Sequence, residues 1–300
     1  MLRYNDQMQN LYLSGIIYAF LGGIFWGFSG ACGQYLFMYK DVDPVWLTGV
    51  RLLGAGVCLF ILTIIKKRAV FRIFKDKSSF FQLIIYSFFG LMLCQFTYYE
   101  TIKHSNVAIA TILQYTAPAI IMVLVCFWFK KLPTLKEFFA LLSATTGLFL
   151  LATHGKFDEL VIDKYPLTIG MISALCAVVY SISPININRK YGTMITLSWG
   201  LLISGSIFFI ASGSYMAMQI TDIYGFLAVC GVIFIGTILA FSFFMRGVDR
   251  IGPTKASMIA SIEPISAMAF SYFWFGVKFI WLDFVGLFFI LLCTILISKR

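Results

Sequence analysis

The stretch Ala256–Phe275, ASMIASIEPISAMAFSYFWF, decides the fold of this chain. It is long enough to cross a membrane as a helix, because roughly 20 apolar residues at about 1.5 Å each span the hydrocarbon core of a bilayer. Near its middle it carries Glu263 followed by Pro264. A carboxyl group is costly in lipid, and proline removes a backbone hydrogen bond that lipid cannot replace. We therefore expect this helix to break at Pro264 and to be surrounded by protein or to line a cavity.

The same pattern occurs once more, 146 residues earlier in the chain. At this constant offset Pro118 aligns with Pro264, and the sequence FWF at 127–129 aligns with FWF at 273–275. The alignment needs no gap from about residue 88 to the C-terminus. Such an internal duplication is the usual construction of secondary transporters, and it predicts a second helix break at Pro118.

The composition excludes a water-soluble domain. Of the 300 residues, 60% are hydrophobic and only 12% are charged, and the mean hydropathy is +0.91. The net charge of +10 resides in short loops between apolar runs, so the positive-inside rule explains it better than a nucleic-acid partner does.

The seven cysteines lie inside apolar runs without paired spacing, so we expect no disulfide, metal site or cofactor. The N-terminus lacks the features of a removable signal peptide.

Ten apolar runs predict an all-α integral membrane protein with ten transmembrane helices. The runs lie at about 13–38, 45–65, 80–102, 108–129, 134–153, 167–188, 195–217, 224–245, 256–275 and 279–298. We divide the chain into a first five-helix repeat (1–153), an external linker (154–166) and a second five-helix repeat (167–300). Because five is an odd number, the second repeat enters the membrane in the opposite direction, and the two form inverted repeats.

Basic residues are concentrated in alternate loops and at both termini. This larger set contains Arg3, Lys66, Lys67, Arg68, Arg72, Lys75, Lys77, Lys130, Lys131, Lys136, Arg189, Lys190, Arg246, Arg250, Lys255, Lys299 and Arg300. The opposite set contains only Lys40, Lys103, Lys156, Lys164 and Lys278. The excess predicts that both termini are cytoplasmic, in a multi-pass protein of the cell membrane.

Four stretches give the chain a family resemblance. They are FWGFSG at Phe25–Gly30, Pro44 with Arg51, TIKHSNVAIATILQYTAPAI at Thr101–Ile120, and GVDRIGPTKASMIASIEPISA at Gly247–Ala267. With these stretches nearly the whole chain resembles the ten-helix EamA-type permeases of the drug/metabolite transporter superfamily. The resemblance implies a carrier of small metabolites, because members of the superfamily carry amino acids, amines, nucleotide derivatives and other metabolites. Export is favoured by this analogy alone.

The chain departs from the family pattern at one place in each repeat. Many members close the fourth and ninth helices with Gly-Glu, whereas this chain has Lys130-Lys131 and Gly276-Val277. Whatever the acidic residue does in those members, this protein lacks it at both positions.

The first apolar run is rich in glycine. Gly23 and Gly27 are four residues apart, a spacing that lets another helix backbone approach closely. Tight helix packing is the favoured interpretation, although glycines also leave room for a ligand.

Charged residues inside the membrane are the first candidates for a functional site. We interpret Glu263 either as a cavity carboxylate that binds a substrate amine or a proton, or as a group that bonds helix backbone beside Pro264. Arg51 would extend toward the outer surface or bind a carboxylate, either of a ligand or of Glu100. Glu100 and its repeat partner Arg246 lie near opposite helix ends, where they would act as latches in alternating access or be solvated at the interface.

Uncharged polar and aromatic side chains complete the candidate site. Gln95 and Gln114 would hold neighbouring helices together or line a pocket, and Tyr99 lies one turn from Gln95 on the same helix face. Aromatic walls would suit aromatic or cationic organic substrates. The residues expected to form such walls are Trp26, Tyr98, Tyr115, Tyr180 and Phe241.

These observations favour a secondary transporter that moves a small metabolite, such as an amino acid or organic amine, by alternating access at a midplane site. Proton coupling through Glu263 is compatible with this hypothesis. We do not expect an enzyme, although an intramembrane lipid-modifying enzyme is one alternative and a channel or sensor is another. The expected partners are the small-molecule substrate and the lipid bilayer, and the sequence leaves both a monomer and a homodimer open.

Overall fold

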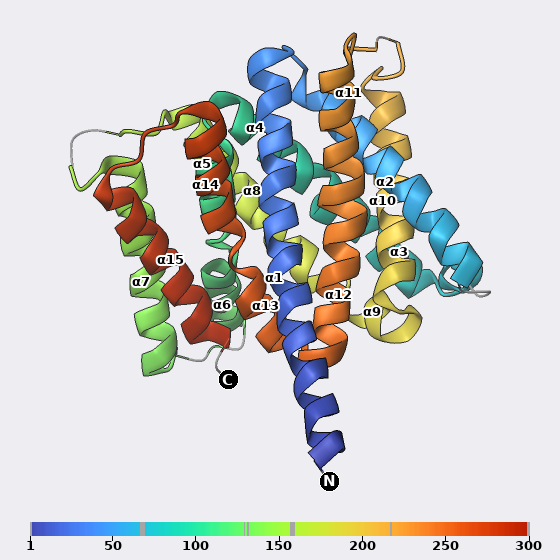
Figure 1. The fold of residues 1–300 in the computed structure, drawn as a ribbon, viewed down its shortest axis with the longest axis horizontal. Coiled ribbons are helices and arrows are strands. Elements are labelled where there is room, and N and C mark those ends of the chain that lie inside the picture. Colours follow the sequence, from blue (N-terminus) through green and yellow to red (C-terminus); the bar gives the residue numbers. More distant parts are fainter. Residues whose placement is uncertain are drawn as a thin grey trace.

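A computed structural model describes residues 2–66, 70–128, 130, 132–156, 160–216 and 218–298, with side chains described in these ranges except for 2–10, 253, 254, 297 and 298. The basic residues Lys67, Arg68, Lys131, Lys299 and Arg300 of the sequence argument lie outside the described residues, as do Phe129 and the side chain of Arg3. The described part of the chain consists of helices and their connections (Figure 1).

The described residues of the first repeat form nine helical segments. They are α1 (Leu2–Tyr39), α2 (Pro44–Lys66), the 3₁₀-helix η1 (Val70–Lys75), α3 (Lys77–Ile85), the π-helix η2 (Tyr86–Met92), α4 (Leu93–His104), α5 (Val107–Gln114), α6 (Ala117–Trp128) and α7 (Leu135–Thr153). Because α3, η2 and α4 run without interruption, they form one span from Lys77 to His104.

The second repeat follows the same plan. It contains α8 (Lys164–Ile182), α9 (Ile185–Tyr191), α10 (Thr193–Ala211), α11 (Ile223–Cys230), the π-helix η3 (Gly231–Leu239), α12 (Ala240–Ile251), α13 (Pro253–Ala260), α14 (Glu263–Phe275) and α15 (Trp281–Ser298). At the offset of 146, the starts of α11, α13, α14 and α15 fall on the starts of α3, α5, α6 and α7.

The prediction of ten spans as two inverted repeats is confirmed. Eight helices of the described chain are long and apolar enough to cross a membrane. The broken pair α13–α14 and the shorter apolar helix α15 are the ninth and tenth. Large side chains such as Phe127 and Trp128 are 83% and 82% exposed, and such a surface is stable only against lipid or another apolar partner.

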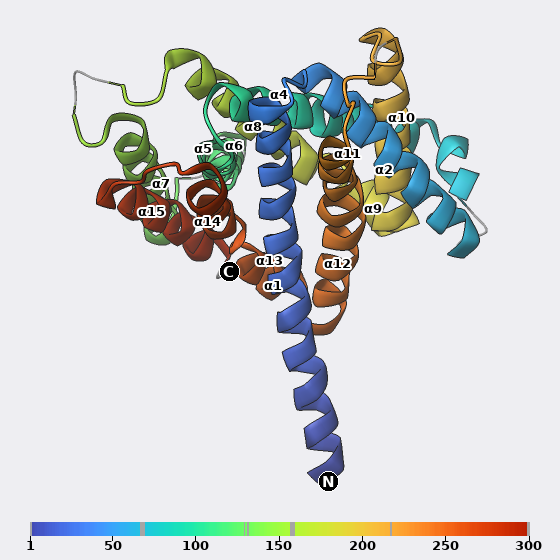
Figure 2. The ribbon, with the colours of Figure 1, turned by 45° about the horizontal axis from the view of Figure 1, so that its top comes forward.

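The two repeats pack around a pseudo-two-fold relationship. Helix α1 packs against α12, η3, α13 and α14, and its counterpart α8 packs in the same way against α4, η2, α5 and α6. At one edge of the molecule α7 lies against α15, and at the other α2 lies against α10 (Figure 1). The start of α1 and the end of α15 lie on the same side of the protein, and α1 extends well beyond the remaining helices on that side (Figure 2).

The fourth and ninth helices are both broken at their proline. A turn at Tyr115-Thr116 separates α5 from α6, and a turn at Ser261-Ile262 separates α13 from α14. Proline has no N–H to donate, and it fits the first turn of a helix, where the N–H has no helical partner, so each helix restarts with its proline in the first turn. Both breaks therefore lie deep within the bundle, where backbone groups are available to a ligand or to neighbouring side chains.

The glycines of α1 allow it to approach the second break. A Cβ atom at Gly23 would collide with the Ala260 carbonyl, and one at Gly27 would collide with the side chain of Ser266. The expected close helix packing at these glycines is confirmed, and its partner is the junction of α13 and α14.

Candidate functional site

A cavity of about 170 Å³ lies between the two repeats, near the middle of α1. Its lining comes from seven of the helical spans. The lining residues are Trp26, Gly30, Arg51, Cys94, Gln95, Tyr98, Gln114, Ala177, Tyr180, Phe241 and Glu263. Of the residues predicted to bind substrate or to form its aromatic walls, all except Tyr99 and Tyr115 line this cavity, and so does Arg51.

A second cavity of about 600 Å³ continues from the first. Both are lined by Trp26, Gln114, Ala177, Tyr180 and Phe241. The larger cavity extends past the middle of α12 at Met245 to the short helix α9 at Asn188. The continuous space is therefore narrow and charged at one end and wide and largely apolar at the other.

Glu263 is positioned by the break in the ninth helix. It is the first residue of α14, so its carboxylate projects from the point where the helix restarts. The Tyr115 hydroxyl donates a hydrogen bond of 3.1 Å to Glu263 Oε2. Tyr115 itself follows the last residue of α5, and this bond therefore joins the break of the first repeat to the break of the second.

Arg51 is buried, with 8% of its surface exposed, instead of extending along its stem to the surface. Its guanidinium donates from Nη1 to the Tyr99 hydroxyl at 2.8 Å and lies over the Tyr99 ring. Tyr99 is fully buried and does not line the cavity, whereas its neighbour Tyr98 does. Arginine has five N–H donors, so one bond to Tyr99 leaves several for a ligand.

The two glutamines have different surroundings. Gln114 Nε2 donates to Ser173 Oγ at 3.0 Å and approaches Cys94 Sγ at 3.3 Å, so it ties α5 to α8 and α4. Gln95 Oε1 is buried and accepts no hydrogen bond from any described residue. A buried acceptor without a partner carries a desolvation cost, and a ligand donor at the cavity would remove that cost.

Aromatic rings also line the two cavities. Trp26 meets the edge of Phe241 at a ring-centroid distance of 5.4 Å and lies 5.3 Å from Phe244. Tyr180 stacks on Tyr86, with their ring centroids 5.7 Å apart. Such faces attract both aromatic groups and cations.

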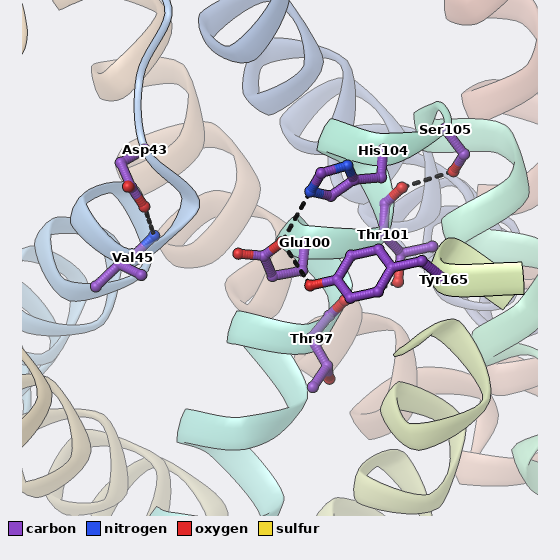
Figure 3. Close-up of polar contacts among 8 residues, drawn as sticks. All are labelled: Asp43, Val45, Thr97, Glu100, Thr101, His104, Ser105 and Tyr165. Atoms are coloured by element: carbon purple, nitrogen blue, oxygen red, sulfur yellow. Dashed lines mark hydrogen bonds and ion pairs between the residues drawn. The ribbon is translucent and has the colours of Figure 1, made fainter. Parts of the chain in front are cut away.

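Glu100 and Arg246 have separate partners at opposite ends of the molecule. Glu100 Oε2 lies 3.4 Å from His104 Nε2 and accepts a hydrogen bond of 3.4 Å from the Tyr165 hydroxyl, all near the end of α4 (Figure 3). The guanidinium of Arg246 lies over the ring of Tyr18, 5.6 Å from its centroid. Neither residue lines the small cavity or the larger one that continues from it.

Two ion pairs between the repeats were missed in the sequence. Lys40 Nζ lies 2.7 Å from Asp222 Oδ2, and Lys190 Nζ lies 2.6 Å from Asp76 Oδ2. The hydrogen bond from Lys40 holds the pKa of Asp222 below its usual range. Hydrogen bonds from Lys190, chiefly, and from Ser79 lower the pKa of Asp76 to about 2. The offset of 146 aligns Asp76 with Asp222, and this alignment was the signal in the sequence that could have indicated a shared role for the two carboxylates.

The described residues hold no group of three or more His, Cys, Asp or Glu side chains placed to bind a metal ion. The chemistry of the cavity is therefore that of a carboxylate, a guanidinium, amides and aromatic rings.

Inverted five-helix repeats, paired helix breaks and a polar cavity between the repeats define a membrane transporter. The chain belongs to the EamA-like transporter family, whose model matches residues 13–153 and 165–299. The expected family is thus confirmed, and the two matches fall one on each repeat.

Two further comparisons agree with this family. The chain is 32% identical over 287 residues, 95% of each protein, to the uncharacterized inner membrane transporter YicL of Salmonella typhimurium. A solved crystal structure has the same fold, with a TM-score of 0.61 and 15% sequence identity over 94% of this chain and 96% of that one. Together these findings support a multi-pass membrane protein with a transport role.

Proposed function

We propose that the protein carries a small amine-bearing metabolite, an amino acid or an organic amine, across the cell membrane by alternating access at the cavity between its repeats. One observation carries the proposal: Glu263 and Arg51, of opposite charge, line the same small cavity. A zwitterionic amino acid presents an ammonium group to the first and a carboxylate to the second. Arginine suits the second role because its fork of donors matches carboxylate geometry.

The wider cavity receives the remainder of the substrate. Its aromatic lining by Trp26, Tyr180 and Phe241 favours an apolar or aromatic side chain, or the hydrocarbon part of an amine. The unpartnered Gln95 Oε1 offers a further acceptor to the ammonium group. This arrangement would orient the substrate with its charged groups in the narrow end.

The distribution of basic residues supports a conformation open toward the cytoplasm. The large cavity reaches Asn188 and Met245, next to the basic residues Arg189 and Arg246 that we assign to the cytoplasmic side. Transport would follow from movement, about the cavity, of groups of helices drawn from both five-helix repeats, 1–153 and 167–300.

Proton exchange is the proposed coupling, and export the proposed direction. A substrate ammonium and a proton would compete for the Glu263 carboxylate, so release of one would favour binding of the other. Alternating access is reversible, and export rests on the family analogy.

A thermal-shift screen of the purified protein in detergent tests the proposal, because a ligand that binds the folded state raises its melting temperature by mass action. Three probes share one skeleton: phenylalanine is a zwitterion, 2-phenylethylamine a cation and 3-phenylpropionate an anion. We expect phenylalanine to stabilise the wild type most. Glu263→Gln should lose stabilisation by phenylalanine and the amine, and Arg51→Gln by phenylalanine and the acid.

Glu100→Gln is the matched control, since Glu100 lies away from both cavities. Equal stabilisation of the wild type and both cavity variants would contradict the proposed site. If the cavity variants lose stabilisation as expected, saturable uptake of the stabilising probe into liposomes separates transport from simple binding.

A further inference from the structure

Tyr115 lies where the two helix breaks meet. It follows the last residue of α5, its ring is half-buried, and it lines the larger cavity. Its hydroxyl lies 3.1 Å from Glu263 Oε2 and 3.5 Å from the carbonyl oxygen of Ala260. A residue of the first repeat thus reaches the Glu263 carboxylate and a backbone carbonyl at the break of the second repeat.

The shorter of these contacts, from the Tyr115 hydroxyl to Glu263 Oε2, is the stronger hydrogen bond. A hydroxyl has one proton to donate, and 3.5 Å is at the limit for an O–H···O bond, whereas a charged carboxylate is the stronger acceptor. Pro264 has no N–H, so it leaves the Ala260 carbonyl without its usual helical donor. Tyr115 therefore sits between a freed carbonyl and the carboxylate and bonds the carboxylate.

We propose that Tyr115 is a positioning residue for the substrate amine: its hydroxyl fixes Glu263 Oε2 and leaves Oε1 for the ligand. The inference rests on the proposed function, in which Glu263 binds the ammonium group. A carboxylate held at one oxygen loses little further conformational freedom when a ligand binds the other, and such preorganisation strengthens binding. Glu263 would otherwise be free to rotate at the start of α14.

Comparison of the two repeats shows that the pairing of a tyrosine with a carboxylate occurs at the break of the second repeat and has no equivalent at the break of the first. The positions equivalent to Tyr115 and Glu263 are Ser261 and Ala117. A serine hydroxyl is too short to reproduce the reach of a phenol, and alanine has no acceptor. The protein therefore has one oriented carboxylate at its two breaks.

A double-mutant cycle tests the inference, with Tyr115→Phe, Glu263→Gln and the combined variant measured against phenylalanine and 2-phenylethylamine. We expect Tyr115→Phe to weaken both probes about tenfold, the effect of losing one hydrogen bond to a charged group. In the Glu263→Gln background the same substitution should have no further effect, because Tyr115 acts only through that carboxylate. The affinity for 3-phenylpropionate should be unchanged throughout, which general damage to the fold would not allow.

Tyr191→Phe is the matched control, because its hydroxyl bonds Ser79 at 3.3 Å, away from both cavities. If Glu263→Gln weakens the amine but Tyr115→Phe does not, or if their effects simply add, the inference is wrong and the proposed function stands. If Glu263→Gln leaves amine binding unchanged, or if none of the three probes stabilises the wild type, the proposed amine site fails and the inference fails with it.

Discussion

Asp76 and Asp222 occupy equivalent positions in the two repeats, and each is paired with a lysine of the other repeat. Each caps the helix that follows it, since Asp76 accepts from Ser78 N and Asp222 from Gly225 N. Lys190 and Asp76 flank one end of the α2–α10 pair, and Lys40 and Asp222 flank the other end. Because both ion pairs are formed at once, they tie α2 to α10 at both ends and do not alternate with each other.

The backbones of α2 and α10 also lie very close together along their length. A Cβ atom at Gly56 would collide with the backbone of Leu202, and one at Gly205 with the backbone of Leu53. This pair is therefore expected to behave as a fixed element of the transporter.

The stabilising contribution of the Asp76 pair is expected to disappear in acid. A carboxylate whose pKa is lowered in the folded state, here to about 2, stabilises the fold above its unfolded value of about 4. That contribution is lost as the pH falls from about 4 toward 2. Asp76→Asn, which keeps a capping side chain, should flatten this part of the curve of melting temperature against pH. An unchanged curve would show that the pair contributes nothing to stability.

Equivalent loops of the two repeats should lie on opposite sides of the membrane. Lys136 and Lys278 are exposed and flank the connections α6–α7 and α14–α15. In a background without native cysteines, an impermeant maleimide applied to intact cells should label Lys278→Cys but not Lys136→Cys. Both should react after permeabilisation. Labelling of both in intact cells, or of Lys136→Cys alone, would contradict the proposed orientation.

Gly27→Val is expected to lower the stability of the fold by about 1–3 kcal/mol, the usual cost of overpacking a tight interface. The new side chain would collide with Ser266 on α14. The comparison is Phe20→Val on the outward face of the same helix, where Phe20 is 41% exposed. Equal melting temperatures for the two variants would mean that α1 does not approach the break as closely as described.

Gln95→Leu separates a ligand-binding role from a structural one. Because Gln95 Oε1 has no described hydrogen-bond donor, replacing the amide with a side chain of similar size should leave the melting temperature unchanged or raise it. Stabilisation by phenylalanine should decrease, since the ammonium group would lose an acceptor. A lower melting temperature with full ligand stabilisation would instead assign Gln95 to helix packing.

Tyr99→Phe should weaken carboxylate-bearing probes only. The variant removes the acceptor of the Arg51 bond while keeping the ring beneath the guanidinium. We expect affinity for phenylalanine to fall about tenfold and affinity for 2-phenylethylamine to be unchanged. A similar loss for both probes would show that Tyr99 supports the cavity as a whole.

The fold was largely predictable because its main signals are local. Apolar run length predicts a membrane span, and the constant offset places the starts of α11, α13, α14 and α15 in the second repeat. The breaks follow from Pro118 and Pro264, whose missing N–H acts on the backbone beside it.

The site was predictable only in part, because neighbours on a helix point about 100° apart and both faces of a buried helix meet protein. The sequence therefore could not decide between Tyr98, which lines the cavity, and Tyr99, which supports Arg51. Nor could it pair Lys40 with Asp222, since the partners lie in different repeats. The link from Tyr115 to Glu263 depends on how the two breaks meet, and only the assembled bundle determines that.

The two described π-helical segments, η2 and η3, indicate in which order features of the chain arose. Segment η2 starts at Tyr86 and η3 at Gly231, within one residue of the aligned position. Segments of this kind are rare in helices, so a single ancestral origin is simpler than two independent ones. The five-helix unit then carried its π-helix before it was duplicated. The difference between Glu263 and Ala117 arose after the duplication, so the irregular helix is older than this asymmetry between the two breaks.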